Sequence, residues 1–153
     1  MMRKRPVREH IRFVLSVLLL CALATGCGLT RQSMNIDYND QRLNDGLEGV
    51  LRGGESARLR DFTSWSWDEV HLFHEHADRN DIEATVGAPV IKGPFYDSKA
   101  SLLVFENAGK PVKAIGIEGD YLRGDDNRVS WPDDVTLAPW GKGFLLMSLP
   151  GPN

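Results

Sequence analysis

The chain has 153 residues, of which 42% are hydrophobic, and a formal net charge of -3 at pH 7. Five of its 18 basic residues and one of its 21 acidic residues lie in the first 26 positions, so the remaining residues carry 13 basic against 20 acidic side chains, a net charge of -7. The length that remains after the first 26 residues suits one domain. The acidity argues against binding to nucleic acid and against attachment to anionic lipid headgroups by charge.

The first 26 residues have the pattern of an export signal. Basic residues between Arg3 and Arg8 precede an apolar run of 11 residues, Phe13–Leu23, which only Ser16 interrupts. A membrane-spanning helix needs about 20 apolar residues, so this run suits a cleaved secretory signal better than a lasting anchor. We therefore expect a signal peptide over residues 1–26 and an exported protein.

The segment LATGC at 23–27 resembles the lipobox of bacterial lipoproteins. In that family the signal is cut before the cysteine, whose sulfur carries diacylglycerol and whose new amino group is often acylated, for example with palmitate. The resemblance implies lipid attachment at Cys27 and a membrane-anchored place in the cell envelope. The chain departs from the family's pattern at Ala24, where the family usually has leucine. Two alternatives stay open: cleavage after Ala24, which would release a secreted protein, and an uncleaved anchor.

A polar stretch follows Cys27. Residues 28–39 show no helical or strand period, which predicts a flexible tether over 27–39 and a folded domain over 40–153. Cys27 is the only cysteine after the signal, so the domain cannot form an internal disulfide. Its stability must therefore come from the core.

Two helices are expected in the domain. The first spans 40–52, where Asp40 can cap the start and Gly53 can adopt the left-handed conformation that ends a helix. The second follows the cap residue Asp78 and ends at Gly87. The apolar residues at helical spacing are Leu43, Leu47, Val50 and Leu51 in the first helix, and Ile82 and Val86 in the second.

Two short strands are predicted between these helices. Brief alternation over 57–63 predicts an edge strand. Trp65 and Trp67 then lie two apart, as do Val70 and Leu72, which predicts a strand over 68–73 with one buried face.

The C-terminal half predicts further strands. The clearest pattern is a hairpin over 101–119, whose three-residue turn Asn107-Ala108-Gly109 has a glycine for a positive φ. We expect an irregular loop over 119–143, with one short strand near 128–131, and a last strand over 143–149 inside the sheet. Together the elements predict an α+β fold, with two short helices packed on an antiparallel sheet of four to five strands.

The strongest candidate metal site is a group of three histidines, His71, His74 and His76, with Glu69, Glu75 and Asp78 close by. Imidazole and carboxylate groups are the ligands of zinc and copper sites. However, strand alternation points His71 away from the other two histidines, and the spacing matches no helical metal motif or zinc finger. The sequence therefore favours a polar strand end, and no metal or cofactor is assigned.

Other candidate chemistry has weaker patterns. The segment 119–128 is rich in aspartate, but its spacing fails the calcium-loop pattern and favours a solvated loop. The sequence has no GxSxG motif, no glycine-rich phosphate loop after a strand and no cysteine suited to nucleophilic catalysis, so we assign no catalytic residue and do not expect an enzyme. Of the four tryptophans, at least two are expected in the core.

Residues 60–149 resemble small uncharacterised bacterial lipoproteins, through FTSWSWDEVHLF at 62–73 and its pattern Trp67-Asp68-x-Val70-x-x-Phe73. The resemblance implies a compact helix-on-sheet domain at the envelope and carries over no catalytic residue. The helix that ends in Gly87-Ala88-Pro89 is also similar to small outer-membrane assembly lipoproteins and to inhibitor-like modules that bind proteins on one sheet face.

These observations favour a lipid-anchored envelope protein without catalytic activity, which binds or helps to assemble another envelope protein. The alternative is a lipoprotein that binds a small ligand or a metal ion through the His71–His76 region and the 119–143 segment. An exposed apolar sheet face would favour the first function, and a deep pocket lined by those residues would favour the second.

Overall fold

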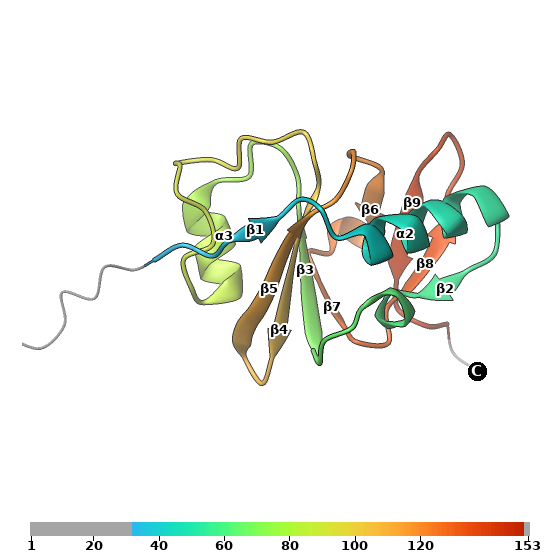
Figure 1. Ribbon diagram of the computed structural model, residues 1–153, viewed down its shortest axis with the longest axis horizontal. Coiled ribbons are helices and arrows are strands. Elements are labelled where there is room, and N and C mark those ends of the chain that lie inside the picture. The colour runs from blue at the N-terminus through green and yellow to red at the C-terminus, as the bar shows by residue number, and fades with distance from the viewer. Residues whose placement is uncertain (1–31, 152–153) are drawn as a thin grey trace, which may run out of the picture. The chain divides into compact units, whose positions relative to one another are not determined.

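The computed structural model describes residues 32–151 (Figure 1). The predicted signal peptide over 1–26 and the predicted lipid-attachment residue Cys27 lie outside the described residues. From Gln32 onward the chain forms one compact unit. Its described part has two α-helices and nine short strands in two mostly antiparallel sheets, which confirms the α+β class. Within that part, no helix combines the length and apolarity needed to cross a membrane.

The first sheet has five strands, and neighbouring strands are antiparallel with one exception. At one edge, Ile36–Asp37 pairs in parallel with Lys110–Gly116. In spatial order the strands are β1 (Ile36–Asp37), β5 (Lys110–Gly116), β4 (Leu102–Asn107), β3 (Glu69–Phe73) and β7 (Ser130–Pro132).

The second sheet has four strands. It was not expected, because the sequence predicts a single sheet. The segment 119–143, expected as a loop with one short strand, contains three strands of three or four residues, too short to show a period. One of them, β7, joins the first sheet, and the other two join the second. In spatial order the second sheet is β2 (Ala57–Arg58), β8 (Thr136–Pro139), β9 (Leu145–Ser148) and β6 (Leu122–Gly124), so the predicted internal position of the last strand is confirmed.

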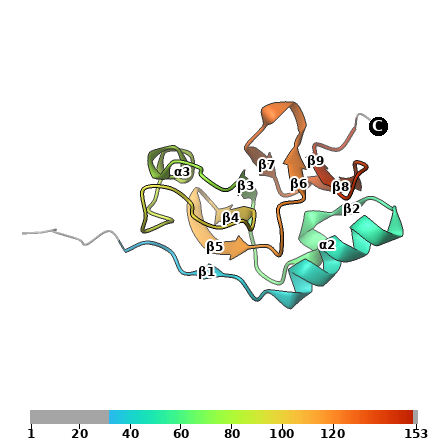
Figure 2. The same ribbon diagram turned by 90° about the horizontal axis from the view of Figure 1, so that it is seen from above.

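Helix α2 (Gln41–Gly53) packs against the second sheet (Figure 2). As predicted, Asp40 caps the helix, and its carboxylate accepts the backbone N–H of Leu43 at 3.0 Å. The predicted end is wrong by one residue. The helix continues through Gly53, and Gly54 takes the left-handed conformation at φ 76°.

The predicted edge strand over 57–63 is shorter than expected. Only Ala57–Arg58 form β2, at the edge of its sheet, and a 3-10 helix (Leu59–Phe62) follows. Phe62 from this turn packs on α2, where a Cβ at Gly46 would lie 2.3 Å from its ring. The glycine is therefore needed for the close approach of the two segments.

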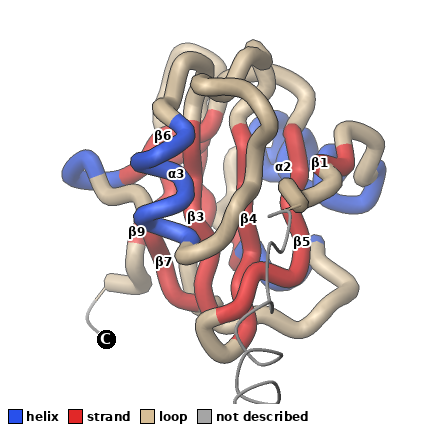
Figure 3. The backbone as a smooth tube through the Cα atoms, turned by 90° about the vertical axis from the view of Figure 1, so that its left-hand side faces the viewer, coloured by secondary structure: helices blue, strands red, loops and turns tan. Residues whose placement is uncertain are grey.

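Helix α3 (Arg79–Val86) has the predicted ends. Asp78 caps it by accepting the backbone N–H of Asn80 at 2.7 Å, and Gly87 ends it at φ 72°. The helix and the loop that follows it cover one face of the first sheet (Figure 3).

Strands β4 and β5 form the predicted hairpin, with a tighter turn than expected. Asn107 pairs with Lys110, so the turn has two residues, Ala108 and Gly109, instead of three. Both have positive φ, 51° and 68°, which is the type I′ geometry that matches the twist of the paired strands.

Two hydrophobic cores lie on opposite faces of the first sheet. The first core lies between this sheet, the second sheet and α2, and includes Val70 and Phe105. The second core lies under α3 and includes Phe73. Strand β3 is therefore buried on both faces, whereas its sequence predicts one buried face. Trp67 and Trp131 are buried, which confirms core positions for two of the four tryptophans.

The tether predicted over 27–39 is folded in its described part. Ile36–Asp37 form β1 and pair with β5. The backbone N–H of Met34 also donates to the carbonyl of Pro89 at 3.3 Å. Residues 34–38 alternate apolar and polar side chains, and Met34 and Ile36 pack against the second core while the backbone pairs with the edge of β5.

Candidate functional site

Three side chains with metal-ligating groups lie together on the α3-side face of the first sheet. The register places Glu69 of β3 directly opposite Glu106 of β4. His71 is two residues further along β3 and therefore shares the face of Glu69. One ligand atom from each residue lies within 4.8 Å of the other two. We call Glu69, His71 and Glu106 the Glu–His–Glu cluster.

The two inner members of the cluster are buried, with 2% exposure for His71 and 5% for Glu106. Nε2 of His71 lies 3.4 Å from Oε1 of Glu106, yet neither atom has a hydrogen-bond partner in the described part of the chain. A buried polar atom without a partner costs about 1–3 kcal/mol. A proton on the imidazole or a cation bound by both atoms would offset this cost.

Ser130 of β7 contacts the other nitrogen of the imidazole. It stands opposite His71 in the register of β3 and β7, and its Oγ lies 2.7 Å from Nδ1. When Nδ1–H donates to this hydroxyl, a neutral imidazole presents the lone pair of Nε2 on the side of Glu106. Metal-bound histidines are commonly oriented by such a hydrogen bond from the far nitrogen.

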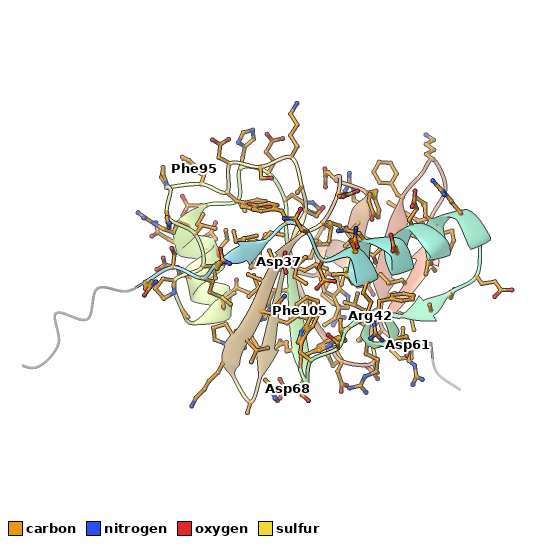
Figure 4. The ribbon with its side chains drawn as sticks, in the orientation of Figure 1. Asp37, Arg42, Asp61, Asp68, Phe95 and Phe105 are labelled. Carbon is orange, nitrogen blue, oxygen red and sulfur yellow. The ribbon has the colours of Figure 1, made fainter. Side chains whose placement is uncertain are left out.

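Asp68 ties together the strand ends that carry the two glutamates. Its backbone N–H donates to the carbonyl of Glu106 at 2.9 Å. Its carboxylate accepts the N–H of Ala108, in the hairpin turn, at 2.7 Å. Figure 4 shows Asp68 at the turn end of the sheet. These two contacts keep the start of β3 in register with the end of β4.

The two carboxylates of the cluster oppose one another electrostatically. Like charges directly opposite in an antiparallel pair are destabilising. The burial of Glu106 increases this repulsion, because the local dielectric constant is lower than that of water. A divalent cation bound to Glu69 and Glu106 would replace the repulsion with attraction.

The spacing of the inner pair matches that of two ligands on one tetrahedral ion. Zinc binds nitrogen and oxygen at about 2.0–2.1 Å, which places two such ligand atoms about 3.3 Å apart. Nε2 of His71 and Oε1 of Glu106 are 3.4 Å apart. An ion held by two ligand atoms lies to one side of the line between them. The two ligand atoms can therefore lie this close without a hydrogen bond between them, as Nε2 of His71 and Oε1 of Glu106 do.

An open depression of about 460 Å³ lies at the outer side of the cluster. Its lining includes Glu69, Ser130 and Arg128. Two of these residues come from the 119–143 segment, which the alternative functional hypothesis names together with the histidine region. The depression gives an ion a path from solvent to Glu69.

The other two histidines of the predicted group lie elsewhere. Nδ1 of His74 is 2.8 Å from Oδ1 of Asp120. His76 is in a turn at φ 69°, and 78% of its side chain is exposed. The structure therefore does not bring the three histidines together, and it joins His71 to Glu106 instead.

Asp120 accepts several side-chain hydrogen bonds, although its segment was expected to be a solvated loop. Besides His74, it accepts hydrogen bonds from Ser101 Oγ and from Nη1 of Arg123, each at 3.0 Å. Burial raises the pKa of Asp120, but these hydrogen bonds outweigh burial and hold that pKa below its ordinary value. The segment continues as β6 and a 3-10 helix (Asp125–Asn127), so it is not an irregular loop.

Ser130, His71 and Glu106 contain the groups of a hydrolase triad, but in the reverse orientation. In the Ser-His-Asp triad, Nε2 faces the serine and Nδ1 faces the carboxylate. Here Nδ1 faces Ser130 and Nε2 faces Glu106. The geometry therefore suits metal coordination better than acyl transfer, and we assign no catalytic residue.

Glu106 and Ser130 were missed in the sequence analysis. The available signal for Glu106 was a carboxylate in an otherwise apolar strand, which is unusual unless the group has a partner. Ser130 lies in β7, which overlaps the short strand expected near 128–131, but no pattern in the sequence indicated that this strand pairs with β3 opposite His71.

No family model, curated protein or solved structure matches this chain. The interpretation of the cluster therefore comes from its own geometry and charge.

Proposed function

We propose that this chain is an envelope lipoprotein, held to a membrane by lipid on Cys27, whose domain binds a divalent transition-metal ion at the Glu–His–Glu cluster. One observation carries the metal proposal: buried Nε2 of His71 and Oε1 of Glu106 lie at ligand spacing without hydrogen-bond partners in the described residues. The resemblance of LATGC at 23–27 to a lipobox supports the anchor.

The cluster supplies three protein ligands to the ion. His71 contributes Nε2, Glu106 contributes the buried carboxylate oxygen, and Glu69 contributes a carboxylate from the solvent side. Three protein ligands leave a fourth position for water or for a group from another molecule. One imidazole with two carboxylates suits zinc, and also manganese or iron, better than it suits copper(I).

A protein-binding function, which the sequence favours, has less specific support. Its best candidate contact is Trp140, which is 60% exposed in the turn between β8 and β9. Exposed tryptophans are frequent contributors to protein recognition. If an envelope partner binds there, Trp140→Ala should abolish its crosslinking, whereas an unchanged set of crosslinked proteins would remove this support.

Zinc titration of the detergent-solubilised chain tests the metal proposal. We expect a 1:1 binding isotherm by calorimetry and a rise in Tm with free zinc, because an ion that binds only the folded state adds about 2.7 kcal/mol at 100 times its Kd. The variants Glu106→Gln and Glu69→Gln keep side-chain shape and should lose most of this effect. His76→Gln, outside the cluster, is the matched control and should retain it.

Two results would contradict the metal proposal. One is the absence of any zinc-dependent rise in Tm of the wild-type chain, which would leave a proton as the bridge between His71 and Glu106. The other is an equal loss of zinc binding in Glu106→Gln and His76→Gln, which would indicate binding to surface histidines.

Intact mass spectrometry of the membrane-extracted protein tests the anchor. The expected species lacks residues 1–26 and carries diacylglycerol on Cys27. An unmodified species that begins at Thr25 would overturn it.

A further inference from the structure

The chain that leads from the predicted anchor to the domain is shorter than the sequence indicates, because its described part is bound to the domain. In addition to β1 and the contact of Met34, Nζ of Lys113 lies 2.9 Å from the carboxylate of Asp37. The ring of Tyr38 lies against Gly116 of β5, where a Cβ would be 2.2 Å from it. Residues 34–38 are therefore part of the folded unit.

This attachment limits how far the domain can lie from the lipid. The first residue bound to the domain is Met34, seven residue steps after Cys27, and seven residues span at most about 25 Å. A free tether through residue 39 would span at most about 43 Å. On the proposed anchor at Cys27, on which this inference rests, the part of the domain around residues 32–38 must therefore stay close to the bilayer surface.

This part of the domain presents exposed aromatic side chains. Residues 33–38 and the loop 90–97 line a groove of about 320 Å³. At its rim, Phe95 is 51% exposed and Tyr38 is 43% exposed. Figure 4 shows Phe95 on the outside of the domain, away from Asp68.

The loop that carries Phe95 is held by backbone hydrogen bonds on both sides. The N–H of Arg79 donates to the carbonyl of Pro94 at 2.9 Å. Tyr96 donates to the carbonyl of Ala77 and accepts from His76, each at 2.9 Å. Phe95 is therefore presented to solvent by an ordered backbone.

We propose that the loop Gly93–Phe95 docks on the lipid bilayer that holds the anchor, with Phe95 inserted at the interface. Phenylalanine is one of the side chains that interfacial segments bury at the boundary between headgroups and acyl chains. A short tether raises the effective concentration of the loop at the surface, so a weak affinity of the loop is sufficient.

The test uses the full lipidated protein, purified from membranes and reconstituted in phosphatidylcholine vesicles that contain brominated lipids. The variant Lys92→Cys carries an environment-sensitive fluorophore beside Phe95. Glu55→Cys, exposed beyond the far end of α2, carries the same label as control. Intact mass first verifies the lipid on Cys27 of each variant.

We expect several-fold stronger quenching of the label at position 92 than at position 55, and we expect Phe95→Ser in the Lys92→Cys background to reduce it. Equal quenching at the two positions in lipidated protein would overturn the docking and leave the anchor standing. Quenching at position 92 that Phe95→Ser leaves unchanged would overturn the role of Phe95. A protein without lipid on Cys27 would overturn the anchor and the docking together.

Discussion

The two faces of the first sheet are made by the same strands but hold different chemistry. On the face toward α2, Val70 pairs with Phe105. The rings of Trp65 and Trp67 each pack edge-on against the ring of Phe105, with 5.1 Å between ring centroids. On the face toward α3, Glu69 pairs with Glu106 on the same two strands, beside buried His71. Adjacent residues on one strand therefore belong to an apolar core and to a polar cluster.

This difference indicates separate roles for the two faces. The apolar face needs nothing from outside to be stable, because burial of its side chains is favourable in itself. The polar cluster buries Nε2 of His71 and Oε1 of Glu106 without hydrogen-bond partners among the described residues, which costs free energy. A ligand bound by both atoms would offset that cost.

The largest effect is expected from the apolar face. Phe105→Ala should lower the free energy of unfolding by about 3–5 kcal/mol, because it leaves a cavity between two tryptophans. Urea denaturation would measure this change. A loss below about 1 kcal/mol would mean that the two rings collapse into the space.

On the polar face, we expect one substitution to lower the free energy of unfolding more than two substitutions together. In the presence of a chelator, Glu106→Leu alone should cost about 2 kcal/mol, because His71 is left buried beside an apolar group. The double variant His71→Leu/Glu106→Leu should lie within about 1 kcal/mol of the wild type, because buried polar pairs are often replaced by apolar residues without loss. Additive losses in urea denaturation would show that the pair stabilises the fold by itself.

The helix over the apolar core offers a matched pair of glycines. Gly46→Ala should lower the free energy of unfolding by about 1–2 kcal/mol, because the new methyl group would meet the ring of Phe62. Gly49 has no atom within 4 Å of its Cβ position, so Gly49→Ala should raise stability by up to about 1 kcal/mol. Thermal unfolding of the two variants separates the effect of packing against Phe62 from the effect of helix propensity. The same sign for both would contradict the contact with Phe62.

The smallest effect is expected at the hydrogen-bonded aspartate beyond the cluster. Because the pKa of Asp120 is lowered in the folded state, its carboxylate stabilises the fold above the pKa of an unfolded aspartate, about 3.9, and this contribution is lost as the pH falls through the folded-state pKa. Asp120→Asn should cost less than about 1 kcal/mol at pH 7, since the group is partly exposed and screened by solvent.

Urea denaturation at several pH values would check this. The difference between Asp120→Asn and the wild type should shrink below about pH 4. A difference that grows on acidification would contradict the assignment.

Features that depend on neighbouring residues were predicted well. The caps Asp40 and Asp78, the end of α3 at Gly87 and the β4–β5 hairpin all follow from contacts within a few residues. The errors at Gly53 and in the length of the hairpin turn amount to one residue each. Local preference selects the element, while packing decides its last residue.

Longer-range features were not predictable from the sequence. Strands β6, β7 and β8 are too short to show a period, and their pairing partners decide which sheet they join. The same holds for β1, whose two residues, Ile36 and Asp37, form a strand by pairing with β5. The prediction of lipid on Cys27 lies outside the described residues and stays a prediction.

The sequence by itself determined the two helices, the main hairpin and the α+β class, and it predicts the lipidation site. It also placed His71 and Glu69 among six candidate ligands, although it favoured a polar strand end over a metal site. Only the tertiary structure decided that Glu106 completes their cluster and that the chain before Asp40 is bound to the domain. The physical reason is that strand register is set by contacts between residues far apart in the chain, here by Asp68 between β3 and the β4–β5 turn.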